Sequence, residues 1–368
     1  MLSISTISQA EKLVLGATIL GTGGGGNPGE GLAMLKRVLE AGKRIDIVDL
    51  GELPEDSVVV VPYYVGSIAP GLAPKKQIKI INAIEKAFEI MEKELGAKIA
   101  GVVASELGGE NTPIALKIAA EIGIPAIDGD LLGRAAPELH QCTVHIFNIP
   151  MHPSVLVSET GNVVIMRGYA DIDDYEAIAR YLSVLSGRYV AVVDTPMKRH
   201  EAEKAVVRGT ISKCIRLGEE VLKARAEGRD PVKAIAEVLE GWAVFKGVVE
   251  RYTWRNEGGF LKGEAIVRGV GLFSGRVLKS WIMNEHIMVW IDNEPLVMPP
   301  DLFMLVMDDG TPITNTELKE GMVVNGIAAK APSVWRTPRG LELFGPRHFG
   351  FNYDYIPVEE LVKERGLT

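Results

Sequence analysis

The alternation of short apolar runs with helical patterns constrains the fold of this chain more than any other feature. Four apolar runs occupy residues 45–50, 57–62, 98–104 and 124–128. They are continuous rather than alternating in polarity, which is typical of strands covered on both faces. Apolar residues at helical spacing fill residues 8–20, 29–42, 77–95 and 112–122. This order predicts an α/β fold with a doubly wound, mostly parallel sheet.

The second half of the chain has a different pattern. Helical stretches are predicted at residues 173–186 and 197–226, and Asp230 with Pro231 begins another short helix. From Trp242 onward, short β-like runs separated by Gly, Asn and Pro dominate.

These two patterns predict two domains, which suits a chain of 368 residues. The first is an α/β domain over residues 1–165, and it carries a glycine-rich loop and several acidic loops. Residues 166–368 are predicted to form a helical segment followed by a mainly β (α+β) domain.

Composition excludes several classes of protein. The net charge of -8 is opposite to the basic surface that nucleic-acid binding requires. Only two cysteines are present, Cys142 and Cys214, so a disulfide scaffold and a multi-cysteine metal site are excluded. The two could pair, but a reducing compartment is the simpler interpretation. Residues 1–10 lack a targeting pattern and no 18-residue apolar stretch exists, so we expect a cytoplasmic protein that does not span a membrane.

A glycine-rich loop, GTGGGGNPGEG, fills residues 21–31. It lacks the Gly-Lys-Ser/Thr step of a Walker loop and follows a helix rather than a strand, so nucleotide binding is not expected. Asn27 is predicted to cap the next helix, with Pro28 at its first position and Glu30 completing a capping box. The loop could be only a cap, but its free N–H groups favour ligand contact. We assign that contact to Gly23, Gly24, Gly25 and Gly26.

Three loops with chemically useful side chains follow predicted strands. In an open parallel sheet, ligands bind outside the carboxyl ends of the strands. Tyr63-Tyr64 follows the second run, Ser105-Glu106 follows the third, and Asp128-Gly129-Asp130 follows the fourth. This convergence predicts a site for a small-molecule substrate at that edge.

Three carboxylates are the catalytic candidates: Glu106, Asp128 and Asp130. Paired carboxylates can divide acid and base roles, or hold a divalent ion. Asp128 and Asp130 face the same side of an extended stretch, although Asp130 could instead cap a following helix. Glu106 has no evident capping role and therefore ranks above Glu110.

Further substrate contacts are assigned to Gly108, Gly109, Glu110, Arg134 and His140. Arg134 could anchor a substrate carboxylate or pair with Glu138. Three histidines lie within residues 140–152, but the HExxH and HxH patterns are absent, so no metal ligand is assigned. Cys142 is expected to be a buried small residue rather than a nucleophile. Glu285 and His286 could face the first domain or cap a turn.

The same motifs carry a family resemblance. They are GTGGGGNP at 21–28, SELGGENT at 105–112, PAIDGD at 125–130, GRAAPE at 133–138, GGFLKGEAIVRG at 258–269, Asn284-Glu285 and Pro300-Asp301-Leu302. In this order they resemble the DUF917 family, described as S-methyl thiohydantoin desulfurase-like and often found with hydantoinase/oxoprolinase-type proteins. The resemblance implies an α/β domain followed by a β-rich domain. It also implies a hydrolase that acts on a five-membered cyclic amide-like ring and releases a thiol.

Such a reaction fits the candidate residues. Glu106 or Asp128 could activate water, glycine N–H groups at 23–26 or 108–109 could stabilise developing charge, and Arg134 could bind an acidic ring substituent. Two alternatives stay open: a non-catalytic partner subunit or small-molecule sensor working with a hydantoinase-like enzyme, and a nucleotide-dependent enzyme. A divalent metal also stays open, and the chain is compatible with a homo-oligomer without specifying one.

Overall fold

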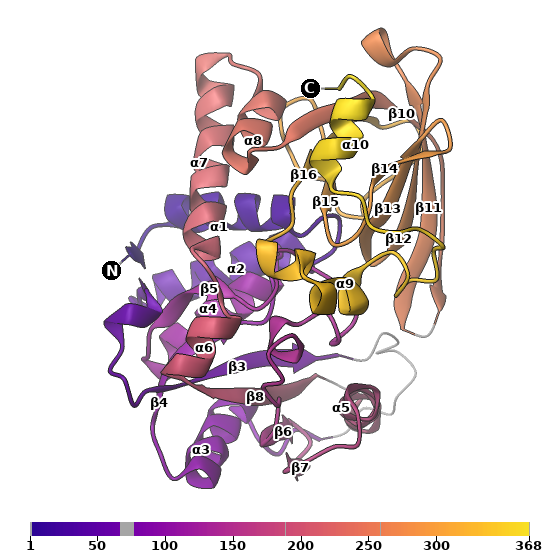
Figure 1. Ribbon diagram of the computed structural model, residues 1–368. Helices are drawn as coiled ribbons and strands as arrows, with labels where there is room; N and C mark the ends of the chain where they lie inside the picture. Colours follow the sequence, from indigo (N-terminus) through magenta and orange to yellow (C-terminus); the bar gives the residue numbers. More distant parts are fainter. Residues whose placement is uncertain (1, 67–76, 188, 258, 368) are drawn as a thin grey trace.

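The computed structural model describes residues 2–66, 77–187, 189–257 and 259–367, which form two sheets with helices around them (Figure 1). The first, sheet A, has the strand order β1-β2-β5-β4-β3-β8-β6-β7, with β9 paired to β5. Its strands are β1 (Leu2–Ile4), β2 (Ile45–Val48), β3 (Val58–Val65), β4 (Ile99–Ala104), β5 (Ala126–Asp130), β6 (Ser154–Ser158), β7 (Val163–Met166), β8 (Val190–Lys198) and β9 (Val207–Arg208).

The four central strands of sheet A, β2-β5-β4-β3, run parallel. The helices that belong to this half are α1 (Ile7–Leu20), α2 (Pro28–Glu40), α3 (Ala83–Leu95), α4 (Asn111–Ile122), α5 (Ile172–Ser186), α6 (Arg199–Ala205) and α7 (Thr210–Glu227). The predicted α/β fold class is confirmed. The outer strands β1, β6, β7, β8 and β9 add antiparallel pairs to this centre.

Both faces of sheet A are buried, as the continuous apolar runs predicted. Val60 and Val102 pack into a core with α1 to α4 and α7. Val59, Val61 and Val103 pack on the opposite face with α5 and α6. Successive strand residues alternate between the two cores, so each run must be apolar throughout.

Two predicted helices have different bounds in the structure. The stretch 197–226 is interrupted, because the chain leaves α6 at Val206 and forms β9, which pairs with Gly129 and Asp130 of β5 before Gly209 begins α7. The stretch 77–95 becomes helical only at Ala83. The N–H groups of Lys79 and Ile80 instead donate to the Glu159 carbonyl.

Sheet B is antiparallel and curled, with the order β14-β13-β12-β11-β10-β16-β15. Its strands are β10 (Trp242–Glu257), β11 (Phe260–Gly269), β12 (Val277–Met283), β13 (Glu285–Ile291), β14 (Glu294–Val297), β15 (Leu302–Val306) and β16 (Val323–Ala329). The accompanying helices are α8 (Pro231–Leu239), α9 (Pro338–Phe344) and α10 (Val358–Glu364). Helix α8 packs between α7 and strands β10 and β16 of sheet B, and α9 lies between sheet B and sheet A (Figure 1).

Strands β8 and β9 follow residue 165 but belong to sheet A. Sheet A thus continues to Arg208. The predicted domain boundary near residue 165 stays a prediction. Among the described residues, no helix is long and apolar enough to cross a membrane.

Candidate active site

A cavity of about 640 Å³ lies where the carboxyl ends of β3 and β4 meet the loops of sheet B. Its wall combines the glycine loop after α1, the segment after β5, helix α5, and loops next to β13 and β15. The cavity thus lies at the edge of the parallel sheet where the sequence predicted a site. Sheet B closes the other side.

The glycine loop forms one wall of the cavity, from Gly23 to Gly26. Gly23, Gly25 and Gly26 adopt φ values of +96, +77 and +83, which favour glycine. A Cβ atom on Gly24 would lie 1.8 Å from Oε1 of Glu285. The loop can therefore lie against sheet B only without side chains. Ligand contact by these four glycines stays a prediction, and their position supports it.

The cap that follows the loop is confirmed in part. Asn27 accepts from the N–H groups of Gly29 and Glu30, and Pro28 opens the helix. The predicted capping box is wrong, because the Asn27 N–H donates to Oε2 of Glu110 at 2.8 Å rather than to Glu30. Glu110 therefore links the loop that follows β4 to the glycine loop. It is not among the cavity-lining residues of the described chain.

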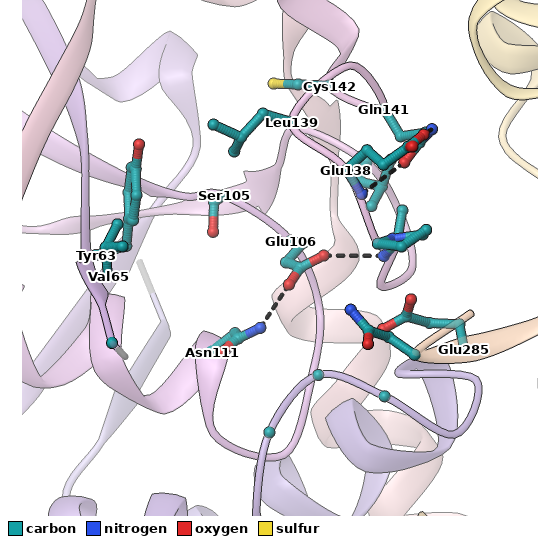
Figure 2. A pocket seen from close by; sticks show the side chains of 18 of the residues that line it. Tyr63, Val65, Ser105, Glu106, Asn111, Glu138, Leu139, Gln141, Cys142 and Glu285 are labelled. Carbon is teal, nitrogen blue, oxygen red and sulfur yellow. Dashed lines mark hydrogen bonds between the residues drawn. The ribbon is translucent and has the colours of Figure 1, made fainter. Parts of the chain in front are cut away.

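Glu106 follows β4 and reaches the centre of the cavity (Figure 2). One carboxylate oxygen accepts from Nδ2 of Asn111, and the other accepts from the Ala136 N–H at 2.9 Å. Burial raises the pKa of Glu106 to about 7, and these two hydrogen bonds oppose that rise. Near neutral pH both the protonated and the ionised form of Glu106 are therefore populated, and the ionised form can act as a general base.

Glu285 begins β13 and enters the same cavity from sheet B (Figure 2). Its side chain is 2% exposed, and Oε2 has no hydrogen-bond partner among the described residues. Burial and the nearby Glu106 raise the pKa of Glu285 well above its ordinary value, while Arg134 lowers it. Two carboxylates in one cavity thus hold their protons with different strength, which separates an acid from a base.

The sequence left the position of Glu285 undecided between a turn cap and the first domain. The only signals were its place between two β-like runs and its presence in the family motif Asn284-Glu285. Nothing local in the sequence indicates that it meets Gly24.

Asp128 and Asp130 lie outside the set of described cavity-lining residues. Asp128 accepts from the N–H of Ser212 at 2.9 Å and from its hydroxyl, in the first turn of α7. Asp130 accepts from the N–H groups of Leu132 and Gly133 at 2.9 and 2.7 Å, and so holds a turn rather than a helix. Burial raises the pKa of Asp130 to about 7. The catalytic roles of Asp128 and Asp130 stay predictions.

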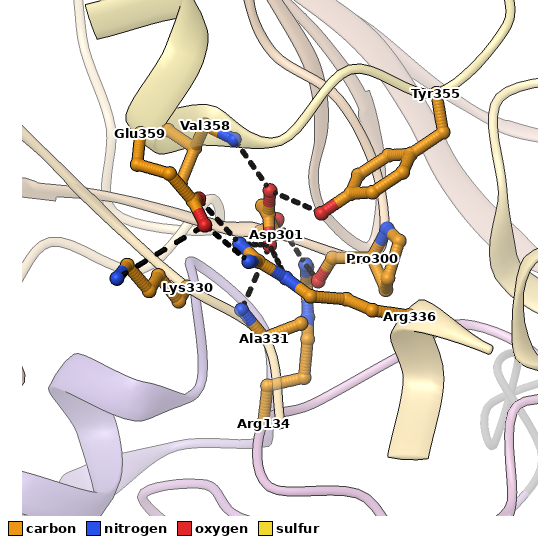
Figure 3. A network of polar contacts seen from close by, with 9 residues as sticks. All are labelled: Arg134, Pro300, Asp301, Lys330, Ala331, Arg336, Tyr355, Val358 and Glu359. Carbon is orange, nitrogen blue, oxygen red and sulfur yellow. Dashed lines mark hydrogen bonds and ion pairs between the residues drawn. The ribbon is translucent and has the colours of Figure 1, made fainter. Parts of the chain in front are cut away.

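Arg134 is fully buried, and all five of its N–H groups have protein acceptors. Nε donates to the Ala135 carbonyl at 2.9 Å. Nη1 donates to the carbonyls of Pro300 and Asp301 at 3.0 and 2.8 Å (Figure 3). Nη2 donates to Oγ1 of Thr22 at 3.0 Å and to the His286 carbonyl at 3.1 Å. Burial lowers the pKa of Arg134 to about 10. No N–H group is left for a substrate carboxylate, and the role of Arg134 as a substrate anchor stays a prediction.

The other residues predicted to contact the substrate also lie outside the set of described cavity-lining residues. A Cβ atom on Gly108 would lie 2.4 Å from Cα of Gly25, so this glycine lets the two loops touch. Gly109 packs against Thr18 in the same way. Nε2 of His140 lies 3.6 Å from Asp173, away from the lining residues of the described chain.

Glu138 lines the cavity, but its partner differs from the predicted Arg134. Its Oε2 accepts from Nε2 of Gln141 at 2.6 Å and lies 2.6 Å from Nε2 of His348. Burial raises the pKa of this carboxyl, but its bonds to His348 and Gln141 outweigh burial and leave the pKa below its usual value. Glu138 is therefore a fixed negative charge on the wall.

Cys142 lines the cavity as a buried thiol. Burial raises its pKa to about 12, which keeps the thiol protonated and makes it a poor nucleophile. Cys142 and Cys214 are both free. Among the described residues, no group of three His, Cys, Asp or Glu side chains is placed to hold a metal ion.

These features define a class: a two-sheet α/β protein with a cavity at the junction of a parallel-centred and an antiparallel sheet. Comparison with known families makes the assignment specific. Residues 8–168 match the S-Me-THD-like N-terminal domain, and residues 170–358 match the S-Me-THD-like C-terminal domain. The chain therefore belongs to the S-Me-THD-like family, the S-methyl thiohydantoin desulfurase-like family that its motifs resemble.

A solved structure supports the fold. The chain is similar to a protein from Chromobacterium violaceum known from an X-ray crystal structure, with a TM-score of 0.73 and 23% sequence identity. The match covers 97% of this chain and 100% of the other. No curated protein matches the chain.

Proposed function

We propose that this protein hydrolyses an S-methyl thiohydantoin-type ring and releases a thiol. The observation that carries the proposal is the pair Glu106 and Glu285, two carboxylates that face one cavity and differ in how firmly they hold a proton. Family membership supports the class of substrate. Glu106 is the proposed base and Glu285 the proposed acid.

The proposed reaction starts with the attack of water on the ring carbon that bears the S-methyl group. Ionised Glu106 takes one proton from the water, and the C=N electron pair moves to the ring nitrogen. Protonated Glu106 then passes this proton to that nitrogen. The C–S bond breaks as protonated Glu285 gives its proton to sulfur, and the hydroxyl on carbon returns a proton to Glu285 as the C=O bond forms. The products are a hydantoin and a thiol, and both carboxyl groups regain their starting states.

The glycine loop has donors for the charge that develops on the ring nitrogen. Within the described residues, the N–H groups of Gly23 and Gly26 donate no hydrogen bond to protein atoms. Backbone N–H groups held in a fixed loop stabilise a developing anion without reorganising.

Thiol release, followed with a chromogenic thiol reagent, tests the proposal. The substrates are an S-methyl thiohydantoin and the parent thiohydantoin, supplied with and without divalent metal. We expect thiol release by the wild type, and a loss of about 10²–10⁴-fold in kcat for Glu106→Gln and Glu285→Gln. Glu342→Gln, an exposed substitution on α9, is the control. Full turnover by both cavity variants would overturn the assignment of acid and base.

A second arm separates the catalytic proposal from its alternative. Ring binding without thiol release, followed by activity only on mixing with a hydantoinase-like protein, would instead favour a partner subunit or sensor.

A further inference from the structure

Tyr63 lines the cavity and is held in place by its hydroxyl group. It lies in β3, and its hydroxyl donates to Oδ2 of Asp194 at 2.7 Å. The Tyr175 hydroxyl donates to the same oxygen at 2.6 Å, and the two hydroxyl oxygens are 3.2 Å apart. The far end of the Tyr63 ring is therefore fixed from β8 and α5.

Asp194 is fully buried in β8, where an unpaired carboxylate would be strongly unfavourable. A third hydroxyl, from Thr195, donates to its Oδ1 at 2.9 Å. Burial raises the pKa of Asp194 to about 6, and the three hydroxyl groups oppose that rise. The proposed chemistry of Glu106 and Glu285 makes no use of this buried group. Three residues donate a hydroxyl group to Asp194, and Tyr63 alone among them lines the cavity of the described chain. Tyr175 and Thr195 are not among its lining residues.

The Tyr63 ring faces the centre of the cavity. Figure 2 shows the ring nearly edge-on, with one face turned toward Ser105 and Glu106. Burial and the neighbouring Asp194 and Tyr175 raise the pKa of Tyr63 well above its ordinary value, so the ring stays a neutral phenol. A fixed, neutral aromatic face beside a reactive carboxylate suits a flat ligand, because aromatic faces stack on planar π-systems.

We infer that Tyr63 is the wall on which a planar five-membered ring stacks, and that Asp194 is the positioning residue that fixes this wall. The inference rests on the proposed function for the identity of the ring. It adds a selectivity: planar rings with sp² atoms are preferred over saturated, puckered rings of the same size.

Calorimetric binding tests the stacking separately from catalysis. The probes are a hydantoin, which is planar and carries no leaving group, and an uncharged tetrahydrofuran bearing the same substituent. For Tyr63→Leu we expect Kd for the hydantoin to rise about threefold to tenfold, while Kd for the tetrahydrofuran changes by less than about twofold. Tyr181→Leu makes the same exchange on the outer side of α5, where the side chain is 65% exposed, and both constants should stay unchanged.

Asp194→Asn tests the positioning role. We expect a smaller rise in the hydantoin Kd, and in KM with kcat retained, because the ring remains but its far end is less firmly held. Circular dichroism and the melting temperature check folding. If Asp194→Asn does not fold, Tyr63→Phe replaces it, since it keeps the ring face and removes the bond to Asp194.

Equal losses for the two probes in Tyr63→Leu, no loss for either, or no hydantoin binding by the wild type would overturn the inference. These outcomes are distinct from failure of the proposed function. A wild type that prefers the planar probe but releases no thiol keeps the stacking wall and overturns the hydrolase. Thiol release by a wild type that does not prefer the planar probe keeps the hydrolase and overturns the stacking wall.

Discussion

Gly24 and Glu285 meet where the two sheets face each other, and the carboxylate occupies the space that a side chain on Gly24 would need. A Cβ atom there would lie 1.8 Å from Oε1, closer than atoms can approach. The glycine loop is thus complementary to one particular side chain of sheet B. This contact brings the proposed acid into the cavity of the proposed base.

Gly24→Ala should therefore displace Glu285. We expect kcat for thiol release to fall at least tenfold and the free energy of unfolding to fall by about 1–3 kcal/mol, because the methyl group overpacks the contact. Gly168→Ala is the matched control, since a Cβ atom there meets nothing within 4 Å. Denaturant unfolding and thiol release measure the two effects. An active, fully stable Gly24→Ala would mean that the position of Glu285 is not needed.

The pH profile of kcat/KM should follow the two carboxyl groups. Burial raises the pKa of Glu106 to about 7, so the base is protonated and inactive below that pH, and activity should rise through it. Activity should fall again at higher pH as Glu285 loses its proton, because its pKa is also raised. Thiol release from pH 4 to 10 measures this profile. A rise centred near the ordinary pKa of a glutamate would contradict the assignment of Glu106.

The same raised pKa has a consequence for stability. The folded state holds the Glu106 proton more firmly than the unfolded state, so folding loses stability as pH rises from the unfolded value toward about 7. Glu106→Gln removes this ionisation. The unfolding free energy of Glu106→Gln minus that of the wild type should increase by roughly 1–3 kcal/mol from pH 5 to pH 8. Urea unfolding at the two pH values tests this, and a constant difference would show that the pKa of Glu106 is not raised.

Arg134→Lys should damage the fold rather than substrate selectivity. The lysine has three donors where the arginine has five in fixed geometry, so buried carbonyls of Pro300, Asp301 or His286 lose their partner. We expect a loss of roughly 3 kcal/mol in unfolding free energy. KM should change by the same factor for rings with and without a carboxylate. A rise in KM confined to the carboxylated ring would restore Arg134 as the substrate anchor.

Asp128→Ala should weaken the start of α7 and leave catalysis intact. The carboxylate accepts from the N–H of Ser212, and loss of such a cap destabilises by about 1 kcal/mol. Ser212→Ala removes the hydroxyl partner and should give a similar loss of stability. We expect kcat to stay within about twofold of the wild type. A hundredfold fall in kcat with unchanged stability would return Asp128 to the role of base.

Much of the fold is readable from local patterns. The apolar runs predicted the four parallel strands, and Asn27 with Pro28 marked the start of α2 because caps depend on neighbouring residues only. Glu106 was also accessible to this reasoning, since a carboxylate directly after a strand falls at the ligand-binding edge. The interruption between α6 and α7 was missed because β9 forms only by pairing with β5, a contact between residues far apart in the chain.

Sequence alone determined most elements of this protein, their alternation in the first half, and the edge of the parallel sheet where polar loops gather. Those features depend on side-chain periodicity and on contacts within a few residues. Tertiary structure decided which groups share the cavity. It turned Asp128 and Asp130 toward backbone N–H groups, gave every donor of Arg134 an acceptor, and brought Glu285 to Glu106. The partners of Arg134 include His286, 152 positions away in the chain, and packing between the two sheets sets such distant contacts.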